Sequence, residues 1–203
     1  MAIIFAVKDT SPPPGPEDQP MTYDPDEIHG SVTVTPGDLI VQAGSTTGLH
    51  GIPGKRGYKA GKKYFEMQYD TLVGSKQVMC GIEPTPFAFE FPTTGGCYFR
   101  AWDRRMDHGG ASHITDGAVT VAEDVIGVAI DFDNQKGFWA LNNDWASYTA
   151  ENSNPVTGVD PLFALVADTY YYPSTSWYYN NSVIEMRPNG FNTYLPPTGY
   201  SYW

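Results

Sequence analysis

Glycine and proline interrupt this sequence every few residues, with 21 Gly and 17 Pro in 203 residues. Both residue types weaken helix interiors, and no segment repeats apolar residues at the spacing of three and four that an amphipathic helix requires. Short apolar or alternating segments occur instead, at 64–69, 78–82, 125–132, 137–141, 162–166 and 183–186. Many short strands between Gly, Pro, Asn and Asp turns predict an all-β protein, either a sandwich or a barrel.

Chain length limits the organisation. The 203 residues suffice for one sizeable core but not for two ordinary domains. No apolar run approaches the ~18 residues of a membrane-spanning helix. The apolar stretch at 2–7 has no basic segment before it and is shorter than the apolar region of a signal peptide. We therefore expect neither membrane insertion nor a secretion signal.

The net charge of −11, from 12 basic and 23 acidic residues, argues against binding to nucleic acids or anionic membrane surfaces. Phosphate backbones and anionic lipids repel a chain this acidic, so we expect no nucleic-acid partner. Nine of the basic residues lie between Lys55 and Arg105, where only five acids occur. This window is interpreted as a polar face rather than an anion site.

Prolines set the first 26 residues apart from the rest of the chain. Pro12, Pro13, Pro14, Pro16 and Pro20 disfavour helix and central strand. The pattern predicts an extended N-terminal arm over 1–26, followed by one domain over 27–203. The arm begins with a short apolar hook that is suited to adding a strand to a partner's sheet: Ile3, Ile4, Phe5 and Val7. Pairing of the hook with the chain's own sandwich, or disorder, stays open.

From about Ile28 to Trp203, an ordered set of motifs resembles a SPRY domain. The matching segments are 61–66 (GKKYFE), 80–82 (CGI), 124–134 (DVIGVAIDFDN), 137–143 (GFWALNN), 172–173 (YP) and 191–200 (FNTYLPPTGY). The resemblance implies an antiparallel β-sandwich of the concanavalin-like jelly-roll type. It also implies a non-catalytic interaction module without metal or cofactor, whose ligand surface is built by loops at one end of the sandwich.

Two segments depart from the usual SPRY pattern and resemble the versions found in tailed-bacteriophage proteins. They are the polar loop from Asn142 to Asp160, which carries Trp145, and the ending from Leu195 to Trp203. This resemblance implies a virion structural protein, either a capsid decoration or a tail or fibre component. Such a protein is assembled in the host cytoplasm, and we expect a homo-oligomer or multiple copies on the particle. Other virion proteins and host-surface glycan or protein are the expected partners.

The alternatives are an intracellular SPRY adaptor and, less favoured, a jelly-roll glycoside hydrolase. The hydrolase needs two facing carboxylates about 5–10 Å apart. The densest acidic spot, Asp131 and Asp133, is expected at a turn. Glu66 has Gln68 two residues later, and Asp70 is expected at the strand end. We therefore expect no enzymatic activity.

No metal site is expected either. Four residues around a glycine-rich loop are candidate ligands without a known ligand spacing: Asp107, His108, His113 and Asp116. Asp131, Asp133 and Asn134 are an acidic turn similar to the calcium loops of legume lectins, but SPRY domains generally bind no metal. Both sets are interpreted as turns, and no glycine-rich phosphate loop indicates a nucleotide.

Aromatic residues, 14% of the chain, are the main candidates for ligand binding. Rigid rings supply contact area at a low entropic cost, and arginines add bidentate bonds to carboxylates. The candidate ligand-binding residues are Trp102, Trp145, Tyr171, Trp177, Tyr178, Arg100, Arg104 and Arg105. Trp102 and Trp177 are the preferred exposed residues. The competing interpretation is that half of these aromatics pack the core, as we expect for Trp139.

The two cysteines, Cys80 and Cys97, do not form a disulfide framework. Each lies in an apolar or aromatic stretch, as buried free thiols often do. We expect both to be reduced, although pairing across neighbouring strands stays open.

Overall fold

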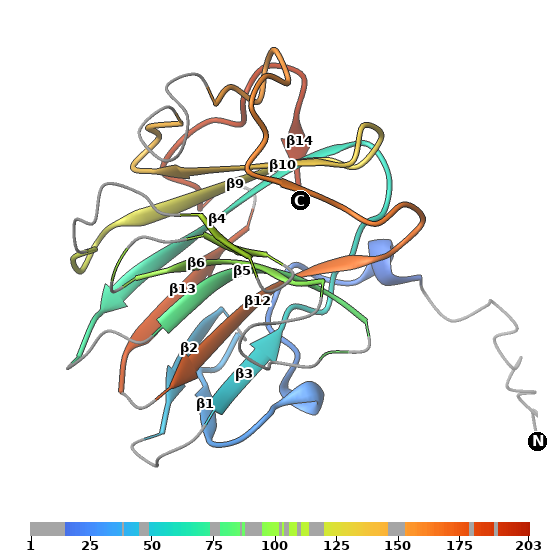
Figure 1. Ribbon diagram of the computed structural model, residues 1–203. Coiled ribbons are helices and arrows are strands. Elements are labelled where there is room, and N and C mark those ends of the chain that lie inside the picture. The colour runs from blue at the N-terminus through green and yellow to red at the C-terminus, as the bar shows by residue number, and fades with distance from the viewer. Residues whose placement is uncertain are drawn as a thin grey trace, which may run out of the picture.

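Two sheets packed face to face form the protein (Figure 1). The computed structural model describes residues 15–37, 39–44, 49–73, 78–85, 87, 95–101, 103, 106–108, 111–113, 120–145, 153–178, 181–188 and 191–203. Within these ranges every strand pair is antiparallel except one. The all-β sandwich predicted from the sequence is confirmed.

The larger sheet contains eight of the described strands, in the order β1-β2-β13-β4-β9-β10-β11. The eighth, β14, pairs in parallel with the beginning of β4. Their bounds are β1 Val32–Val34, β2 Ile40–Ala43, β4 Lys62–Thr71, β9 Val125–Asp131, β10 Lys136–Leu141, β11 Phe163–Ala164, β13 Val183–Arg187 and β14 Ser201–Tyr202. Of the strands expected from sequence, only the segment at 162–166 is much shorter than its apolar run, because just two residues pair with β10.

The smaller sheet has the order β3-β12-β5-β6-β7-β8. Its bounds are β3 Leu49–Pro53, β5 Val78–Pro84, β6 Cys97–Arg100, β7 Met106–His108, β8 Ala111–His113 and β12 Tyr171–Tyr178. Two short 3₁₀ turns, η1 Pro16–Asp18 and η2 Pro25–Glu27, are the helical elements in the described ranges. No helix in this part of the chain is long and apolar enough to cross a membrane.

Alternation along the strands decides which side chains enter the core. On β4, Phe65 and Met67 face the smaller sheet, whereas Tyr64 and Glu66 face outward. On β10, Trp139 lies in the main core, and the centroids of the Trp139 and Phe163 rings are 4.5 Å apart. The prediction that Trp139 is a core residue is confirmed.

The C-terminal segment, defined here as residues 191–203, covers part of the outer face of the larger sheet. Tyr200 packs there with Tyr64 and Phe138, which explains why both faces of β4 and β9 are buried. The backbone N–H of Trp203 then donates to the carbonyl of Tyr64 at 2.7 Å. The Trp203 ring is buried, and its centroid lies 5.0 Å from that of the Phe65 ring. This segment therefore closes one end of the sandwich.

The N-terminal segment, defined here as residues 15–27, packs against the sandwich. Met21 and Tyr23 belong to the core, and the hydroxyls of Tyr23 and Thr175 are hydrogen bonded at 2.8 Å. The N–H of Asp24 donates to the carbonyl of Pro53 at 2.8 Å, along the outer edge of β3, which is the edge strand of the smaller sheet. Residues 15–26 of the arm predicted over 1–26 therefore pack against the domain instead of extending away from it. Prolines prevent helix formation in this stretch, but they do not prevent burial of the residues between them. Residues 1–14 lie outside the described ranges.

Both cysteines are buried on the core side of the smaller sheet, and neither forms a disulfide. Cys80 pairs in register with Phe99, and Cys97 pairs with Ile82. Burial raises the pKa of Cys80 to about 12 and raises that of Cys97 as well. Both thiols are therefore protonated at neutral pH and poor nucleophiles.

Candidate functional site

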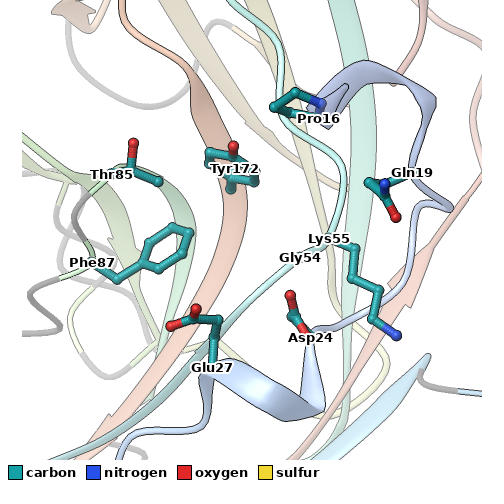
Figure 2. Close-up of a pocket in the computed structure, with 9 residues that line it drawn as sticks. All are labelled: Pro16, Gln19, Asp24, Glu27, Gly54, Lys55, Thr85, Phe87 and Tyr172. Carbon is teal, nitrogen blue, oxygen red and sulfur yellow. The ribbon is translucent and has the colours of Figure 1, made fainter. Parts of the chain in front are cut away.

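A pocket of about 310 Å³ opens where the N-terminal segment meets the end of the smaller sheet (Figure 2). Asp24 and Glu27 line it from the N-terminal segment. Tyr172 and Phe87 line it from the smaller sheet and the loop that follows β5. We call the first pair the carboxylate wall and the second pair the aromatic wall.

The carboxylate wall is fixed by the burial of the residue before it. Because Tyr23 points into the core and Asp24 has an extended backbone, the Asp24 side chain points outward. Its carboxylate accepts a hydrogen bond of 3.1 Å from the N–H of Asp26, which caps the 3₁₀ turn η2. Three residues complete one 3₁₀ turn, so Glu27 lies on the same side as Asp24. Both carboxylates thus border the pocket.

The aromatic wall depends on the alternation of β12. Tyr171 is buried in the core, so its neighbour Tyr172 faces away from the core and borders the pocket. A Cβ atom at Gly57 would lie 2.6 Å from the Tyr172 ring, so only glycine allows this approach. The Phe87 ring meets the Tyr172 ring edge-on, with centroids 5.3 Å apart. Burial raises the pKa of Tyr172, so its hydroxyl stays neutral at physiological pH.

The remaining side of the pocket is the turn after β3. The N–H of Lys55 donates to the carbonyl of Thr22 at 2.8 Å, and the N–H of Gly54 donates to the carbonyl of Pro173 at 2.6 Å. This turn therefore ties the N-terminal segment to β12. The Lys55 side chain extends away from Phe87 and Tyr172 in Figure 2.

A buried polar network supports the aromatic wall from the neighbouring strands. Glu83 pairs in register with Tyr172, and its carboxylate accepts a hydrogen bond from the Tyr98 hydroxyl. The Ser174 hydroxyl donates to the Tyr98 oxygen at 3.0 Å. All three residues of this network are buried. Burial, followed by the Glu83 charge, raises the pKa of Tyr98, so its phenol remains a donor. The network holds β5, β6 and β12 in a fixed arrangement.

Two residues expected to bind a ligand lie in the core instead. Tyr171 and Trp177 are fully buried, because alternate residues of β12 from 171 to 177 all face the larger sheet. The expectation that Trp177 is exposed is wrong. Sequence could not settle the phase of β12, because its period of two is compatible with either face.

The other predicted residues do not gather at the pocket. Arg100 is buried and forms an ion pair with Asp103. Trp145 is partly buried on the outer face of the larger sheet, and the centroids of the Trp145 and Tyr64 rings are 6.2 Å apart. Tyr178 ends β12, and its side chain is not among the described ones. The remaining predicted residues lie outside the described ones: Trp102, Arg104, Arg105, Ile3, Ile4, Phe5 and Val7.

Glu66, considered as a catalytic acid, has a structural role. Its fully buried carboxylate accepts hydrogen bonds from the Tyr64 hydroxyl at 2.7 Å and from the N–H groups of Thr193 and Tyr194 at 2.6 and 2.8 Å. Burial and the hydrogen bond to Glu66 raise the pKa of Tyr64. These bonds attach the C-terminal segment to β4.

The acidic turn after β9 is likewise occupied by bonds within the chain. Asp131 forms an ion pair of 3.0 Å with Lys62 and accepts two hydrogen bonds from Asn134. Although burial opposes ionisation, the bonds from Asn134 and Lys62 lower the pKa of Asp131. Asp133 accepts from the N–H of Gly61 at 2.8 Å.

Over the described ranges, no three His, Cys, Asp or Glu residues gather as candidate metal ligands. Of the second predicted metal set, Asp116 lies outside these ranges. Asp107, His108 and His113 belong to β7 and β8, and their side chains are not described. In register, His113 pairs with Met106 and His108 with Ala111.

Comparison with known proteins identifies the fold. No family model matches the chain, and neither does any curated protein. The SPRY domain of human HERC1 matches 86% of this chain and 99% of its own length, with a TM-score of 0.66 and 16% identity. A further human SPRY domain matches 83% of this chain and 99% of its own length, with a TM-score of 0.56 and 12% identity. The PSpry domain of TRIM65 matches 83% of this chain and 92% of its own length, with a TM-score of 0.57 and 12% identity. The chain therefore has the SPRY-like jelly-roll fold that its motifs predicted.

Sequence reasoning missed the carboxylate wall. Asp24 and Glu27 fall in the stretch predicted to be an arm, where acids are expected to be solvated. A usable signal was present: an aromatic residue followed by Asp-Pro-Asp-Glu is typical of a buried anchor leading into a capped turn. Phe87 gave no such signal, because only the fold brings it beside Tyr172.

Proposed function

We propose that this chain is a non-catalytic module that binds a protein partner through the pocket between the carboxylate and aromatic walls. One observation carries the proposal: the pocket is preformed. Tyr23 anchors one wall through the core, Gly57 and Glu83 support the other, and the Lys55 turn joins the two. A rigid concave site loses little conformational entropy when a ligand binds.

The chemistry of the buried acids favours binding over hydrolysis. Glu66 accepts bonds that attach the C-terminal segment, and Asp131 is paired with Lys62. A glycoside hydrolase needs two carboxylates that face one substrate, and these two serve separate structural contacts instead. Hydrolysis of a glycan by the purified chain, lost in Asp131→Asn, would overturn this part of the proposal.

We further propose that the chain is a virion component of a tailed phage, on the capsid or on a tail or fibre. Support comes from the polar loop that carries Trp145 and from the ending at 195–203, which resemble phage versions of this domain. In this proposal the hook of Ile3, Ile4, Phe5 and Val7 docks on the particle after assembly in the host cytoplasm. The domain, in several copies, then presents its pocket to another virion protein or to host-surface protein or glycan.

A photo-crosslinking experiment tests partner binding. A photoreactive amino acid replaces Thr85, an exposed residue that lines the pocket, in the full chain produced in its native host. The matched control replaces Thr157, an exposed threonine on a loop beside the larger sheet. We expect a defined protein adduct from position 85 only, and the purified partner should bind the chain directly. Equal adducts from both positions, or none, would overturn pocket-mediated binding.

Particle composition tests the virion role separately. We expect the chain to remain in purified particles at a constant ratio to the major capsid protein through successive density gradients. A chain that is abundant in the lysate but absent from the particles would overturn the virion proposal while leaving partner binding intact.

A further inference from the structure

We infer that the pocket takes a basic side chain, lysine or arginine, presented by a protein partner. The inference deepens the proposed function and rests on it, because it names the chemistry that the same pocket recognises. It follows from two carboxylates and two aromatic rings that line one cavity of about 310 Å³ (Figure 2).

The carboxylate wall is electrostatically suited to a cation. The 3₁₀ turn places Asp24 and Glu27 on the same side, where their like charges repel each other. One oxygen of Asp24 accepts from the N–H of Asp26. In the described part of the chain, no side chain donates to the Glu27 carboxylate. A bound ammonium or guanidinium relieves the repulsion and supplies the donors that these oxygens accept.

The aromatic wall suits the same ligand. Tyr172 and Phe87 line the same cavity as the carboxylates, and a cation within about 6 Å of a ring centroid is attracted to the ring face. The chain already uses this geometry elsewhere. The Nζ atom of Lys63 lies 4.1 Å from the ring centroid of Tyr58, and the Nζ atom of Lys59 lies 5.2 Å from the ring centroid of Tyr170. The alkyl stem of a lysine or arginine packs on such rings while its charged end reaches the carboxylates.

The charge around the pocket disfavours anionic ligands. The N-terminal segment from 15 to 27 contains five acids, Glu17, Asp18, Asp24, Asp26 and Glu27, and no basic residue. Among the described residues that line the pocket, Lys55 is the one basic residue, and its side chain extends away from the aromatic wall. A chain of net charge −11 adds a long-range field of the same sign. Such a field speeds the approach of a basic segment and slows that of an acidic one.

The direct test is a titration of the isotope-labelled full chain, followed by backbone amide NMR. The probes are the acetylated amides of arginine and lysine, and the control is the acetylated amide of citrulline, which has the shape of arginine without its charge. We expect arginine to shift the amide signals of Glu27, Lys55 and Thr85, with an affinity at least about fivefold above that of citrulline. Raising sodium chloride from about 50 to about 500 mM should weaken arginine binding.

Matched variants separate the site from general charge. Glu27→Gln should weaken arginine binding about fivefold, whereas Asp26→Asn removes the same charge beside the pocket and should change it less than about twofold. Tyr172→Leu should also weaken it, and Tyr172→Phe, which keeps the ring, should not. Glu27 is exposed, so we expect Glu27→Gln to keep the melting temperature of the parent chain.

Three results would overturn the inference: equal affinity for arginine and citrulline, signal shifts confined to residues away from the pocket, or equal loss in Glu27→Gln and Asp26→Asn. Failure of the inference is distinguishable from failure of the proposed function. If a partner crosslinks through position 85 and still binds after its basic residues at the contact are replaced, binding holds and the basic-side-chain inference fails. If the arginine probe binds as expected but no partner crosslinks, the inferred chemistry stands and the partner proposal fails.

Discussion

The indole N–H of Trp203 donates a hydrogen bond of 3.0 Å to the carbonyl oxygen of Arg56. The guanidinium of Arg56 in turn donates to the carbonyl of Gln19 in the N-terminal segment. One residue in the turn after β3 thus joins the N-terminal segment to the C-terminal segment. The same turn carries Lys55 and Gly57, so the closed end of the sandwich and the pocket share one support.

Replacement of Trp203 by alanine tests this closure. The buried ring contacts Tyr58, Phe65 and Phe132, so we expect Trp203→Ala to lower the free energy of unfolding by about 3–5 kcal/mol. Urea unfolding followed by tyrosine and tryptophan fluorescence measures the change. Leu195→Ala is the control, because Leu195 is 81% exposed, and it should shift stability by less than about 0.5 kcal/mol. Equal losses in both variants would contradict a closing role for Trp203.

Glu66→Gln tests the attachment of the C-terminal segment to β4. The amide keeps the size of the side chain but removes the charge that strengthens the bonds from Tyr64, Thr193 and Tyr194. We expect a loss of about 1–3 kcal/mol and faster hydrogen exchange at the amides of Thr193 and Tyr194. Glu17→Gln, at an exposed position, provides the control. Unchanged exchange at 193 and 194 would mean that other contacts hold the segment.

Gly57→Ala tests the support of the aromatic wall. The added methyl group would lie 2.6 Å from the Tyr172 ring, which must then move. We expect a destabilisation of about 1–3 kcal/mol and a weaker response to the arginine probe. Gly15→Ala is the matched control, because its Cβ would meet Asp18 at an ordinary 3.6 Å. Full retention of arginine binding in Gly57→Ala would show that Tyr172 need not lie where it does.

Asp131 predicts a specific pH dependence. Its pKa in the folded chain lies below the unfolded value of about 3.9, so its ionised form stabilises the fold above that value. This stabilisation is lost as the pH falls through the folded pKa. We expect Asp131→Asn to be less stable than the parent at pH 7, and the difference in free energy of unfolding to shrink below about pH 4. A difference that stays constant down to about pH 2 would contradict the ion pair with Lys62.

Asp70 predicts the opposite sign. Burial, and then the charges of Glu185 and Glu123, raise the pKa of Asp70, so its ionised form destabilises the fold. That destabilisation develops as the pH rises through the unfolded value of about 3.9 toward the folded pKa. We expect Asp70→Asn to raise the melting temperature at pH 7 and to have little effect at about pH 3. A lower melting temperature at pH 7 would mean that the Asp70 carboxylate makes a stabilising contact.

The fold was predictable from sequence because local patterns carry it. The continuous apolar run of β9 and the alternation of β4 indicate strands buried by a second layer, and Trp139 follows from its place on the next strand. The pocket was not predictable in the same way. Whether Tyr171 or Tyr172 faces outward depends on the register of β12 against β5, and the contact of Asp24 with Pro53 joins segments with no local relationship.

The position of β12 has a consequence for how the chain reaches its native state. This strand lies between β3 and β5, although it follows them in sequence by roughly a hundred residues, and β13 likewise lies between β2 and β4. During synthesis, β3 and β5 emerge first and expose unpaired edges until residues 171–178 leave the ribosome. Closure of the smaller sheet is therefore a late, long-range step, which predicts slow folding and a nascent chain that benefits from chaperone protection.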